Sequence, residues 1–279
     1  MLLQEIIRTG EFARLMEEIN NYRQPIALFG LSRTARAAFV AAVRQVTGRH
    51  ILVLTKDERA ASRMTEDISF FAEGAQAFST RDLTLRPLES FSREYEYRRI
   101  KTLGNLIGGS AEIVVSPVEA ALMYTMPKEK FLENTLTVRD TDIIIRDEFV
   151  QKLVNAGYIR RDMVEGAGQF AVRGDIIDLY TPDMPYPVRI ELWGDEIDRI
   201  NTFDLETQRR LEQIKKVHIS PVKEVLFTDT EEALQAIHDF RKKLTAKQKE
   251  YFDTATEKEV ITLENGMMPR SMDKFISIC

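Results

Sequence analysis

The chain has 279 residues, a formal net charge of −5 and one cysteine, Cys279, at its last position. A single cysteine excludes an internal disulfide and fits a reducing compartment, so we expect a cytoplasmic protein. The N-terminal segment is not typical of a signal peptide, and no apolar run approaches the ~18 residues of a membrane span. The acidic balance also weighs against a protein that binds DNA on its own.

The first 126 residues predict short apolar strands separated by helices. An amphipathic helix is expected near the start, with apolar side chains at helical spacing: Phe12, Leu15, Met16 and Ile19. Strands are expected at residues 25–30, 51–55 and 112–116, and helices at residues 31–46, 57–72 and from 117 onward. Apolar strands that alternate with helices indicate an α/β fold with a parallel sheet covered on both faces, RecA-like or Rossmann-like in layout.

From residue 127 to residue 220 the pattern becomes alternating and rich in turns. The clearest strand is VRIELW at residues 188–193, and one helix is expected at residues 147–156. A second long strand or a bulged pair is expected over residues 168–180, with Gly174 as the bulge. This alternation is typical of an antiparallel sheet with one wet face, so we expect an inserted α+β domain.

Helical spacing returns over residues 221–279, which we interpret as the start of a return to the first domain. The last residues, MPRSMDKFISIC, end without a helix cap or a polar tail. We therefore expect a fragment of a longer protein, with three parts at residues 1–126, 127–220 and 221–279.

The turn after residues 25–30 is the first candidate for chemistry. A phosphate-binding loop needs G-x-x-x-x-G-K-[ST] between a strand and a helix, so that its lysine and hydroxyl meet the phosphates and magnesium. Here Gly30 is present, but Ala35, Arg36 and Ala37 occupy the positions of the second glycine, the lysine and the hydroxyl. The loop is degenerate, and we expect neither a nucleotide cofactor nor ATPase activity.

Other catalytic patterns are weak. The three histidines, His50, His218 and His238, have no Cys or carboxylate at metal-ligand spacing, so no metal site is expected. Six carboxylates cluster in sequence and are interpreted as solvated groups on a wet sheet face: Asp175, Asp178, Glu191, Asp195, Glu196 and Asp198. The aromatic and basic run at residues 90–101 is interpreted as a solvated helix start, with stacking on nucleic acid bases as the alternative.

The most distinctive stretch runs from residue 157 to residue 210 and contains GQFAVRGDIIDLY, VRIELWGDEID and FDLETQR. It resembles the UvrB-homology module of bacterial transcription-repair coupling factors, the Mfd family. UvrB, the damage-verifying helicase of nucleotide excision repair, shares the VRGD and RIELxGDEI core. UvrB-type sequences, however, carry an intact phosphate loop and an aromatic hairpin, for which residues 86–109 are too short. The resemblance is strong over residues 134–221, weaker before them and thin after 222.

This resemblance implies a degenerate RecA-like domain with an inserted α+β domain that binds UvrA, the damage-recognition subunit. Carried over by motif, the UvrA-facing residues are Arg160, Arg173, Arg189 and Glu191, whereas one arginine of the family's F-R-V-R-G segment is Ala171 here. RNA polymerase, DNA and ATP-driven translocation belong to other domains of the full-length coupling factors. The resemblance thus implies a non-catalytic module that recruits UvrA and links stalled RNA polymerase to nucleotide excision repair.

The alternation of apolar and charged residues along residues 188–193 predicts the position of two of these residues without reference to the family. Arg189 and Glu191 lie opposite Val188, Ile190 and Leu192 on the strand, so burial of those three places the charged pair on the surface. Exposed arginines suit recognition of a partner's carboxylates. For these residues, surface salt bridges of little energetic value stay open as an alternative. For the function, two alternatives stay open: a UvrB-like module that binds DNA or acts as a helicase, and a nucleotide-binding enzyme domain with an unorthodox loop.

Overall fold

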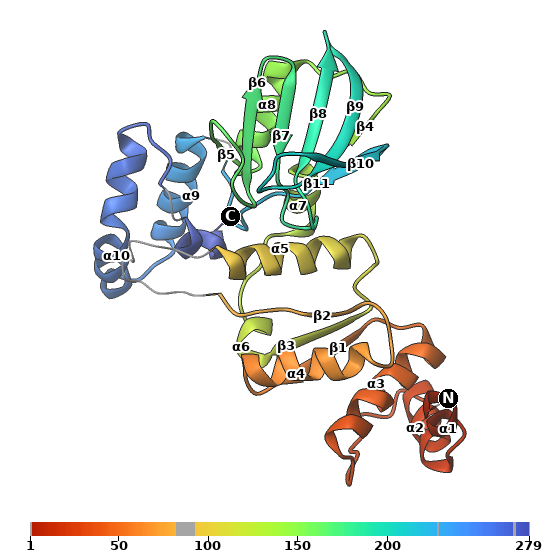
Figure 1. Ribbon diagram of the computed structural model, residues 1–279. Coiled ribbons are helices and arrows are strands. Elements are labelled where there is room, and N and C mark those ends of the chain that lie inside the picture. Colours follow the sequence, from red (N-terminus) through yellow and green to blue (C-terminus); the bar gives the residue numbers. More distant parts are fainter. Residues whose placement is uncertain (1, 82–92, 228, 270–271, 279) are drawn as a thin grey trace. The chain divides into compact units, whose positions relative to one another are not determined.

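The computed structural model describes residues 2–81, 93–227, 229–269 and 272–278. The chain divides into two compact units, whose elements are labelled in Figure 1. Unit 1 comprises Met1–Arg81 with Thr102–Met123, and unit 2 comprises Asp82–Lys101 with Tyr124–Cys279. The three-part division at residues 126 and 220 remains a prediction.

Unit 1 consists of helices and a small sheet. Its helices are α1 (Leu2–Ile7), α2 (Gly10–Asn20), α3 (Arg33–Thr47), α4 (Glu58–Ser69) and α6 (Val118–Ala121). Its strands are β1 (Ile51–Thr55), β2 (Ala75–Ala77) and β3 (Ile113–Pro117). Helix α5 (Glu94–Ile107) runs from unit 2 into unit 1, because the boundary between the units falls at residue 102.

The sheet of unit 1 is parallel, as the sequence predicts. Its strands lie in the order β1-β3-β2, and both pairings are parallel. Helices α3 and α4 pack against it through small and branched side chains, among them Ala37, Ala61 and Ile68, which contact Ile113 and Val115 of β3. Small residues on α3 let the helix approach the sheet closely. The predicted α/β class is confirmed.

The prediction of a strand at residues 25–30 is wrong. These residues form no strand, and Leu28 and Phe29 are 50% and 89% exposed. A strand needs a neighbour to satisfy its backbone groups, and none of the described strands pairs with this segment. The prediction that helices cover both faces of the sheet is also wrong at β1, because Leu52 and Leu54 remain more than half exposed to solvent.

Unit 2 holds the antiparallel strands. Its strands are β4 (Leu136–Arg139), β5 (Ile159–Arg160), β6 (Gln169–Arg173), β7 (Ile176–Leu179), β8 (Val188–Trp193), β9 (Glu196–Phe203), β10 (Arg210–Ile214) and β11 (Lys216–Ile219). Its helices, besides the start of α5, are α7 (Lys128–Glu133), α8 (Arg146–Asn155), α9 (Thr230–Lys242), α10 (Ala246–Glu264) and the 3₁₀ helix η1 (Asp273–Ile278). Helix α8 and strand β8 confirm the predictions for residues 147–156 and 188–193.

Six of these strands form one sheet, in the order β10-β9-β8-β7-β6-β5. All neighbours are antiparallel except β5 and β6, which are parallel. Strands β4 and β11 form a separate antiparallel pair. The sheet therefore follows the chain in simple succession, so residues in consecutive motifs lie on adjacent strands.

The bulge expected at Gly174 is a hairpin turn instead. Arg173 of β6 faces Ile176 of β7, so only Gly174 and Asp175 lie between the strands. Gly174 has φ +59, and a positive φ at the first residue of a two-residue loop is what a type II′ turn requires. The predicted long strand at residues 168–180 is thus a strand pair.

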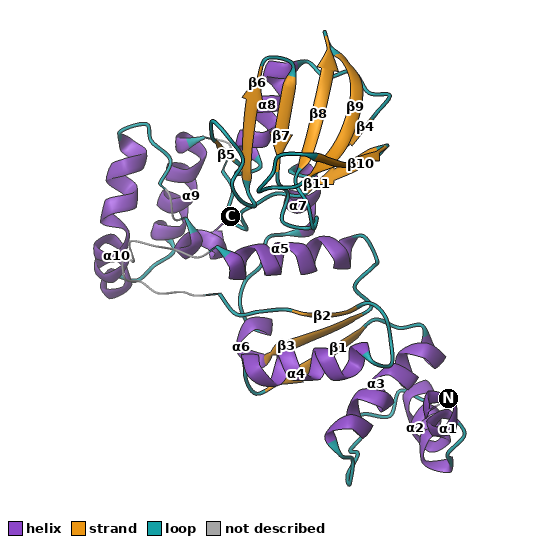
Figure 2. Cartoon of the chain, in the orientation of Figure 1, coloured by secondary structure: helices purple, strands orange, loops and turns teal. Residues whose placement is uncertain are grey.

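One face of the six-stranded sheet carries the core of unit 2. Helix α8 lies against this face (Figure 2) and contributes Phe149 and Leu153, which pack with Phe170, Ile177 and Ile190 from successive strands. These five side chains are at most 6% exposed. The sheet is thereby fixed in register, because a shift of one residue would turn its apolar set away from α8.

A buried ion pair ties α5 to the segment after β11. The Nε atom of Arg99 lies 2.5 Å from a carboxylate oxygen of Glu224, and both side chains are completely buried. The backbone N–H of Glu224 also donates to the carboxylate of Glu96, at 3.1 Å. The sequence predicts a solvated helix start over residues 90–101. Helix α5 begins at Glu94 and confirms the helix for the described residues, but the expected exposure to solvent is wrong at Arg99.

Breaking this pair should destabilise unit 2 strongly. We expect Arg99→Met to lower the free energy of unfolding by about 3–5 kcal/mol, because it removes one partner of a buried ion pair and leaves the charge of Glu224 buried. Urea unfolding followed by circular dichroism measures the change. The double variant Arg99→Met/Glu224→Met should recover much of the loss, since two apolar residues replace a buried pair well. Equal unfolding midpoints for Arg99→Met and wild type would contradict the expectation.

Within the described ranges, no helix is long and apolar enough to cross a membrane. Residues 82–92, which include parts of the 86–109 and 90–101 segments considered above, lie outside the described residues, as does Cys279.

Candidate functional site

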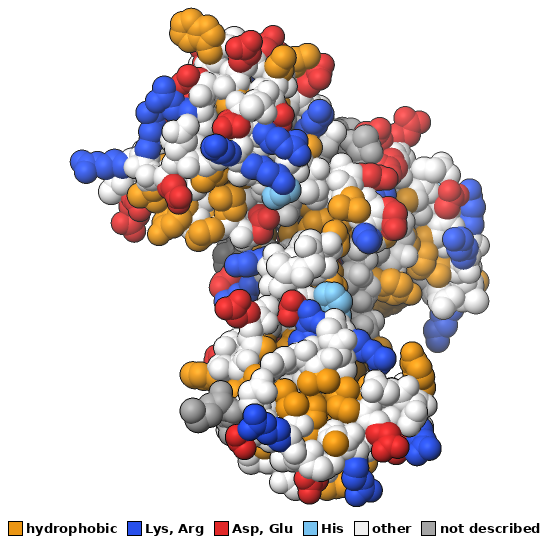
Figure 3. Space-filling view, turned by 90° about the vertical axis from the view of Figure 1, so that its right-hand side faces the viewer, with side chains coloured by type: hydrophobic (Ala, Val, Ile, Leu, Met, Phe, Trp, Pro, Cys, Tyr) orange, Lys and Arg blue, Asp and Glu red, His pale blue; other side chains and the backbone are white. Residues whose placement is uncertain are grey.

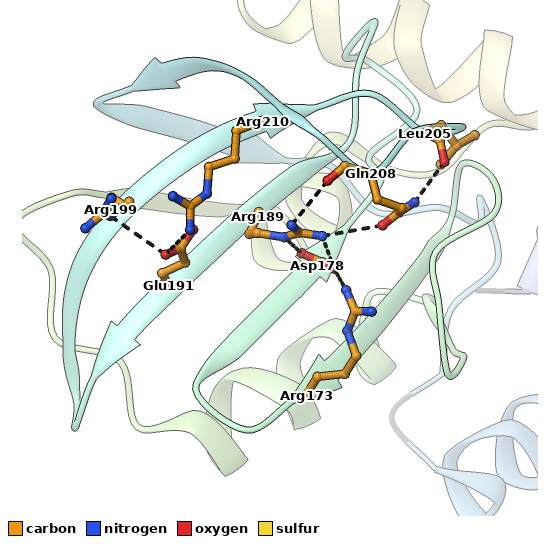
Figure 4. Close-up of polar contacts among 8 residues, drawn as sticks. All are labelled: Arg173, Asp178, Arg189, Glu191, Arg199, Leu205, Gln208 and Arg210. Atoms are coloured by element: carbon orange, nitrogen blue, oxygen red, sulfur yellow. Dashed lines mark hydrogen bonds and ion pairs between the residues drawn. The ribbon is translucent and has the colours of Figure 1, made fainter.

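The candidate site is the face of the six-stranded sheet turned away from α8, hereafter the outer face. Val188, Ile190 and Leu192 of β8 point into the core, so Arg189 and Glu191 between them point to the outer face. The registers Asp178↔Arg189 and Glu191↔Arg199 place Asp178 of β7 and Arg199 of β9 on this face as well. Charged side chains from neighbouring strands therefore meet there (Figure 4).

Asp178 joins two arginines from the strands on either side of it. Arg189 donates to both carboxylate oxygens, from Nε at 2.7 Å and from Nη2 at 2.9 Å, while Nη2 of Arg173 donates at 2.5 Å. The Asp178 side chain is 1% exposed, against 13% for Arg189 and 46% for Arg173. The hydrogen bonds that Arg189 donates to Asp178 raise the pKa of Arg189. Asp178 thus holds one covered and one half-exposed guanidinium in fixed positions.

The loop between β9 and β10 covers Arg189. Gln208 accepts hydrogen bonds from Arg189 through its backbone carbonyl and its side-chain oxygen, each at 3.4 Å. Asp204 fixes the loop by accepting from the N–H and the hydroxyl of Thr207 at 2.8 and 2.7 Å, and these bonds lower the pKa of Asp204. On its other side the Arg189 guanidinium lies 4.7 Å from the centre of the Phe203 ring. Arg189 is therefore enclosed rather than free.

One end of the outer face is apolar. Val164, Ala171 and Phe203 are at most 1% exposed and pack together, with Tyr180 and Leu205 against them. Ala171 stands where the family's motif has an arginine, and its register partner is Asp178. An arginine at position 171 would have to displace Val164 or Phe203, so this chain uses Arg173 and Arg189 alone around Asp178.

A second charged cluster surrounds Glu191. Nη2 of Arg210 lies 2.6 and 2.7 Å from the two carboxylate oxygens of Glu191, and Nε of Arg199 lies 3.7 Å away. Arg199 is bound more closely by Asp198, at 2.7 Å, which raises the pKa of Arg199. Glu191 is 15% exposed, whereas Arg210 and Arg199 are 49% and 43% exposed. The carboxylate is again enclosed and the arginines are not.

Arg160 lies at the edge of the sheet, on β5. Together with Arg161, Asp162, Val172 and Arg173 it lines a recess of about 560 Å³. Its register partner is the core residue Phe170, so Arg160 lies on the core side of the open edge, and Arg161 follows on the side of the outer face. The recess brings Arg160 and Arg161 to Arg173, the exposed member of the Asp178 cluster.

Sequence reasoning located the face but not its internal pairing. The solvated character predicted for Asp178 is wrong, because its register partner Arg189 on β8 and the nearby Arg173 on β6 both bind its carboxylate. The surface position predicted for Arg189 and Glu191 is wrong in part, since the β9–β10 loop and Arg210 cover them. A charged residue inside the apolar run IIDL was the available signal for Asp178.

Removing the shared carboxylate should cost stability. We expect Asp178→Ala to lower the free energy of unfolding by about 3 kcal/mol or more, because Arg189 is left enclosed without a counter-ion. Asp198→Ala is the matched control. It removes a carboxylate that is 48% exposed beside Arg199, and we expect a cost below about 1 kcal/mol. Chemical denaturation of the two variants gives the comparison, and similar losses would contradict it.

The degenerate phosphate loop lies in unit 1. Gly30 has φ +77 and stands in a segment without regular structure, so the strand that should precede such a loop is missing from the described residues. Ser32 caps α3 by accepting from the N–H of Ala35. Arg36 donates to the carbonyl of Leu31 at 3.2 Å, and Ala37 is fully buried against the sheet. Neither side chain is placed to hold a phosphate and a magnesium ion together.

A groove runs beside this loop. Its lining includes Leu28 and Phe29, strand β1, and several cationic side chains of α3 and α4, such as Arg36 and Arg59. Figure 3 shows hydrophobic side chains gathered on the surface of unit 1 with basic ones beside them. The groove is open and apolar, unlike the backbone-lined cradle of a phosphate loop.

We expect no Mg-ATP binding below millimolar concentration and no hydrolysis, because the chain offers neither the lysine nor the hydroxyl that the nucleotide needs at this turn. Isothermal titration with and without magnesium measures this. A micromolar, magnesium-dependent heat would contradict the expectation.

Within the described residues, no group of three or more His, Cys, Asp or Glu side chains is arranged to hold a metal ion. His50 and His218 have local partners instead: Nδ1 of His50 lies 3.2 Å from the carbonyl of Ala111, and Nδ1 of His218 lies 3.0 Å from the Thr137 hydroxyl.

Comparison with known proteins gives matches over up to 98% of the chain. Residues 136–225 match the family model of the UvrB interaction domain. The transcription-repair-coupling factor of Bacillus subtilis (strain 168) is 29% identical over 98% of this chain, and that of Staphylococcus haemolyticus (strain JCSC1435) is 31% identical over 74%. The Staphylococcus aureus (strain Mu50) protein of the same name is 30% identical over 77%. The chain spans 24%, 18% and 19% of the length of these relatives, respectively.

Proposed function

We propose a docking function for this chain, which belongs to the family of transcription-repair-coupling factors and carries a UvrB interaction domain. Its role is to bind UvrA and so to connect a stalled RNA polymerase with nucleotide excision repair in the cytoplasm. Contacts with RNA polymerase and DNA, and movement driven by ATP, are assigned to other domains of the full-length coupling factors.

The binding surface in this proposal is the outer face of unit 2, with Arg173, Arg189 and Glu191, together with Arg160 at the adjoining open edge of the sheet. The observation that carries it is the arrangement of Arg173, Asp178 and Arg189, in which one enclosed carboxylate anchors two guanidiniums. Arg173 stays 46% exposed, and among the described residues only its Nη2 is hydrogen-bonded. Its remaining donors are free for the carboxylates of a partner, and the anchor reduces the entropy lost on binding.

We assign no catalytic step to the chain. The loop positions Ala35, Arg36 and Ala37 support this, because phosphoryl transfer needs a lysine and a magnesium-binding hydroxyl where they stand. The arginines of the outer face are suited to holding a partner, since a guanidinium keeps its proton and does not act as an acid or base.

We expect Arg173→Glu to weaken the complex with UvrA by about 2 kcal/mol or more, roughly thirtyfold in Kd. The substitution removes the exposed donors and places a second carboxylate beside Asp178. Biolayer interferometry with immobilised UvrA and the 279-residue chain measures the affinity, and a thermal melt of each variant checks the fold.

Arg23→Glu is the control, because Arg23 is an exposed arginine of unit 1 that also pairs with a carboxylate, Glu18 at 3.1 Å. It should bind UvrA as the wild type does. A folded Arg173→Glu variant with wild-type affinity would refute this face. Binding to duplex DNA is measured in parallel. A UvrB-like module, the alternative function, would bind DNA with an affinity that falls steeply as the salt concentration rises.

A further inference from the structure

The two charged clusters of the outer face share one design. In each, an enclosed carboxylate on a central strand is approached by arginines from other strands: Asp178 by Arg173 and Arg189, and Glu191 by Arg199 from the adjacent β9 and Arg210 from β10 beyond it. Arg189 and Glu191 both lie on β8, two residues apart, so the clusters are adjacent on one face (Figure 4).

The arginines differ in exposure and in the number of N–H donors that remain without a hydrogen bond among the described residues. Arg189 donates from Nε, Nη1 and Nη2 to Asp178 and Gln208 and is 13% exposed. Arg199 is held by Asp198 at 2.7 Å. Arg210 is 49% exposed and uses only Nη2, for Glu191, among the described residues. Its Nε and Nη1 make no hydrogen bond with the described residues, so these two nitrogens remain available as donors.

On this basis we propose that Arg210 of β10 contacts the partner directly and that Glu191 acts as the positioning residue that aims it. The inference rests on the proposed docking function and deepens it. The partner group that Arg210 fits is a carboxylate, because the N–H groups on its Nε and Nη1 are unused donors of a charged guanidinium and can each bond to an acidic side chain.

Anchoring explains why Glu191 lies underneath instead of at the tip of the surface. A free surface arginine loses rotamer entropy when a partner immobilises it, and this loss weakens binding. The contacts of 2.6 and 2.7 Å with Glu191 fix one end of the Arg210 guanidinium before binding. A glutamate at 15% exposure contributes more by holding Arg210 than by reaching a partner itself.

The test compares Arg210→Glu with Arg241→Glu in UvrA binding by the 279-residue chain. The two arginines are closely matched: Arg241 is 44% exposed and ion-paired with Asp253 at 2.6 Å, but it lies on α9. We expect Arg210→Glu to weaken binding at least tenfold at low salt, with the difference from wild type shrinking as salt rises. Arg241→Glu should leave the affinity unchanged.

Two further variants separate contact from folding. Arg210→Gln removes the charge without setting a second carboxylate beside Glu191. It should weaken binding while the chain stays folded, because Arg199 still lies 3.7 Å from Glu191. Arg210→Lys keeps the charge but loses the planar donors, and its affinity should fall between those of wild type and Arg210→Gln. These two variants carry the test if Arg210→Glu does not fold.

The outcomes are distinct. If wild type binds UvrA and folded Arg210→Gln binds equally tightly, the role of Arg210 is refuted while the docking function stands. If wild type shows no binding at tens of micromolar, the docking function itself is overturned, and the assignment of Arg210 with it.

Discussion

A carboxylate that is 1% exposed has to be neutralised where it lies, and at Asp178 arginines from two neighbouring strands do so. This constraint orders the rest of the outer face. The Arg189 side chain binds Asp178 and is enclosed by the Phe203 ring and the β9–β10 loop. Arg173 reaches back from the hairpin turn at Gly174, so its free end is presented at the rim. The face is therefore rigid at its centre and accessible at its margin.

Much of the fold could be predicted because its signals are local. The parallel strands at residues 51–55 and 113–117, helix α8 and strand β8 follow from apolar spacing alone. The failure at residues 25–30 has a different origin: these residues have the composition of a buried strand, but pairing depends on a neighbouring strand that local sequence does not reveal. The turn at Gly174 was misread as a bulge because both devices use a glycine with positive φ.

The candidate site was only half predictable. Alternation along β8 places Arg189 and Glu191 on one face, and a family motif selects Arg173. Neither source contains the cross-strand register, which alone brings Asp178 to Arg189 and Glu191 to Arg199. Arg210 was missed for the same reason, since its partner is 19 residues away in sequence and is met only by passing around the β8–β9 and β9–β10 turns.

The ion pair between Arg99 and Glu224 also has a consequence for synthesis of the chain. The two residues are 125 positions apart, so at about 5–20 residues per second the ribosome needs roughly 6–25 s to deliver the second after the first. During that interval the Arg99 side chain has no Glu224 to bind, and the start of α5 cannot reach its final state. The strands in between can pair in order as they emerge, since each lies next to its predecessor from β5 to β10. The sheet that carries the outer face can thus form before the contact between Arg99 and Glu224, and helices α9, α10 and η1 of the same unit are synthesised later still.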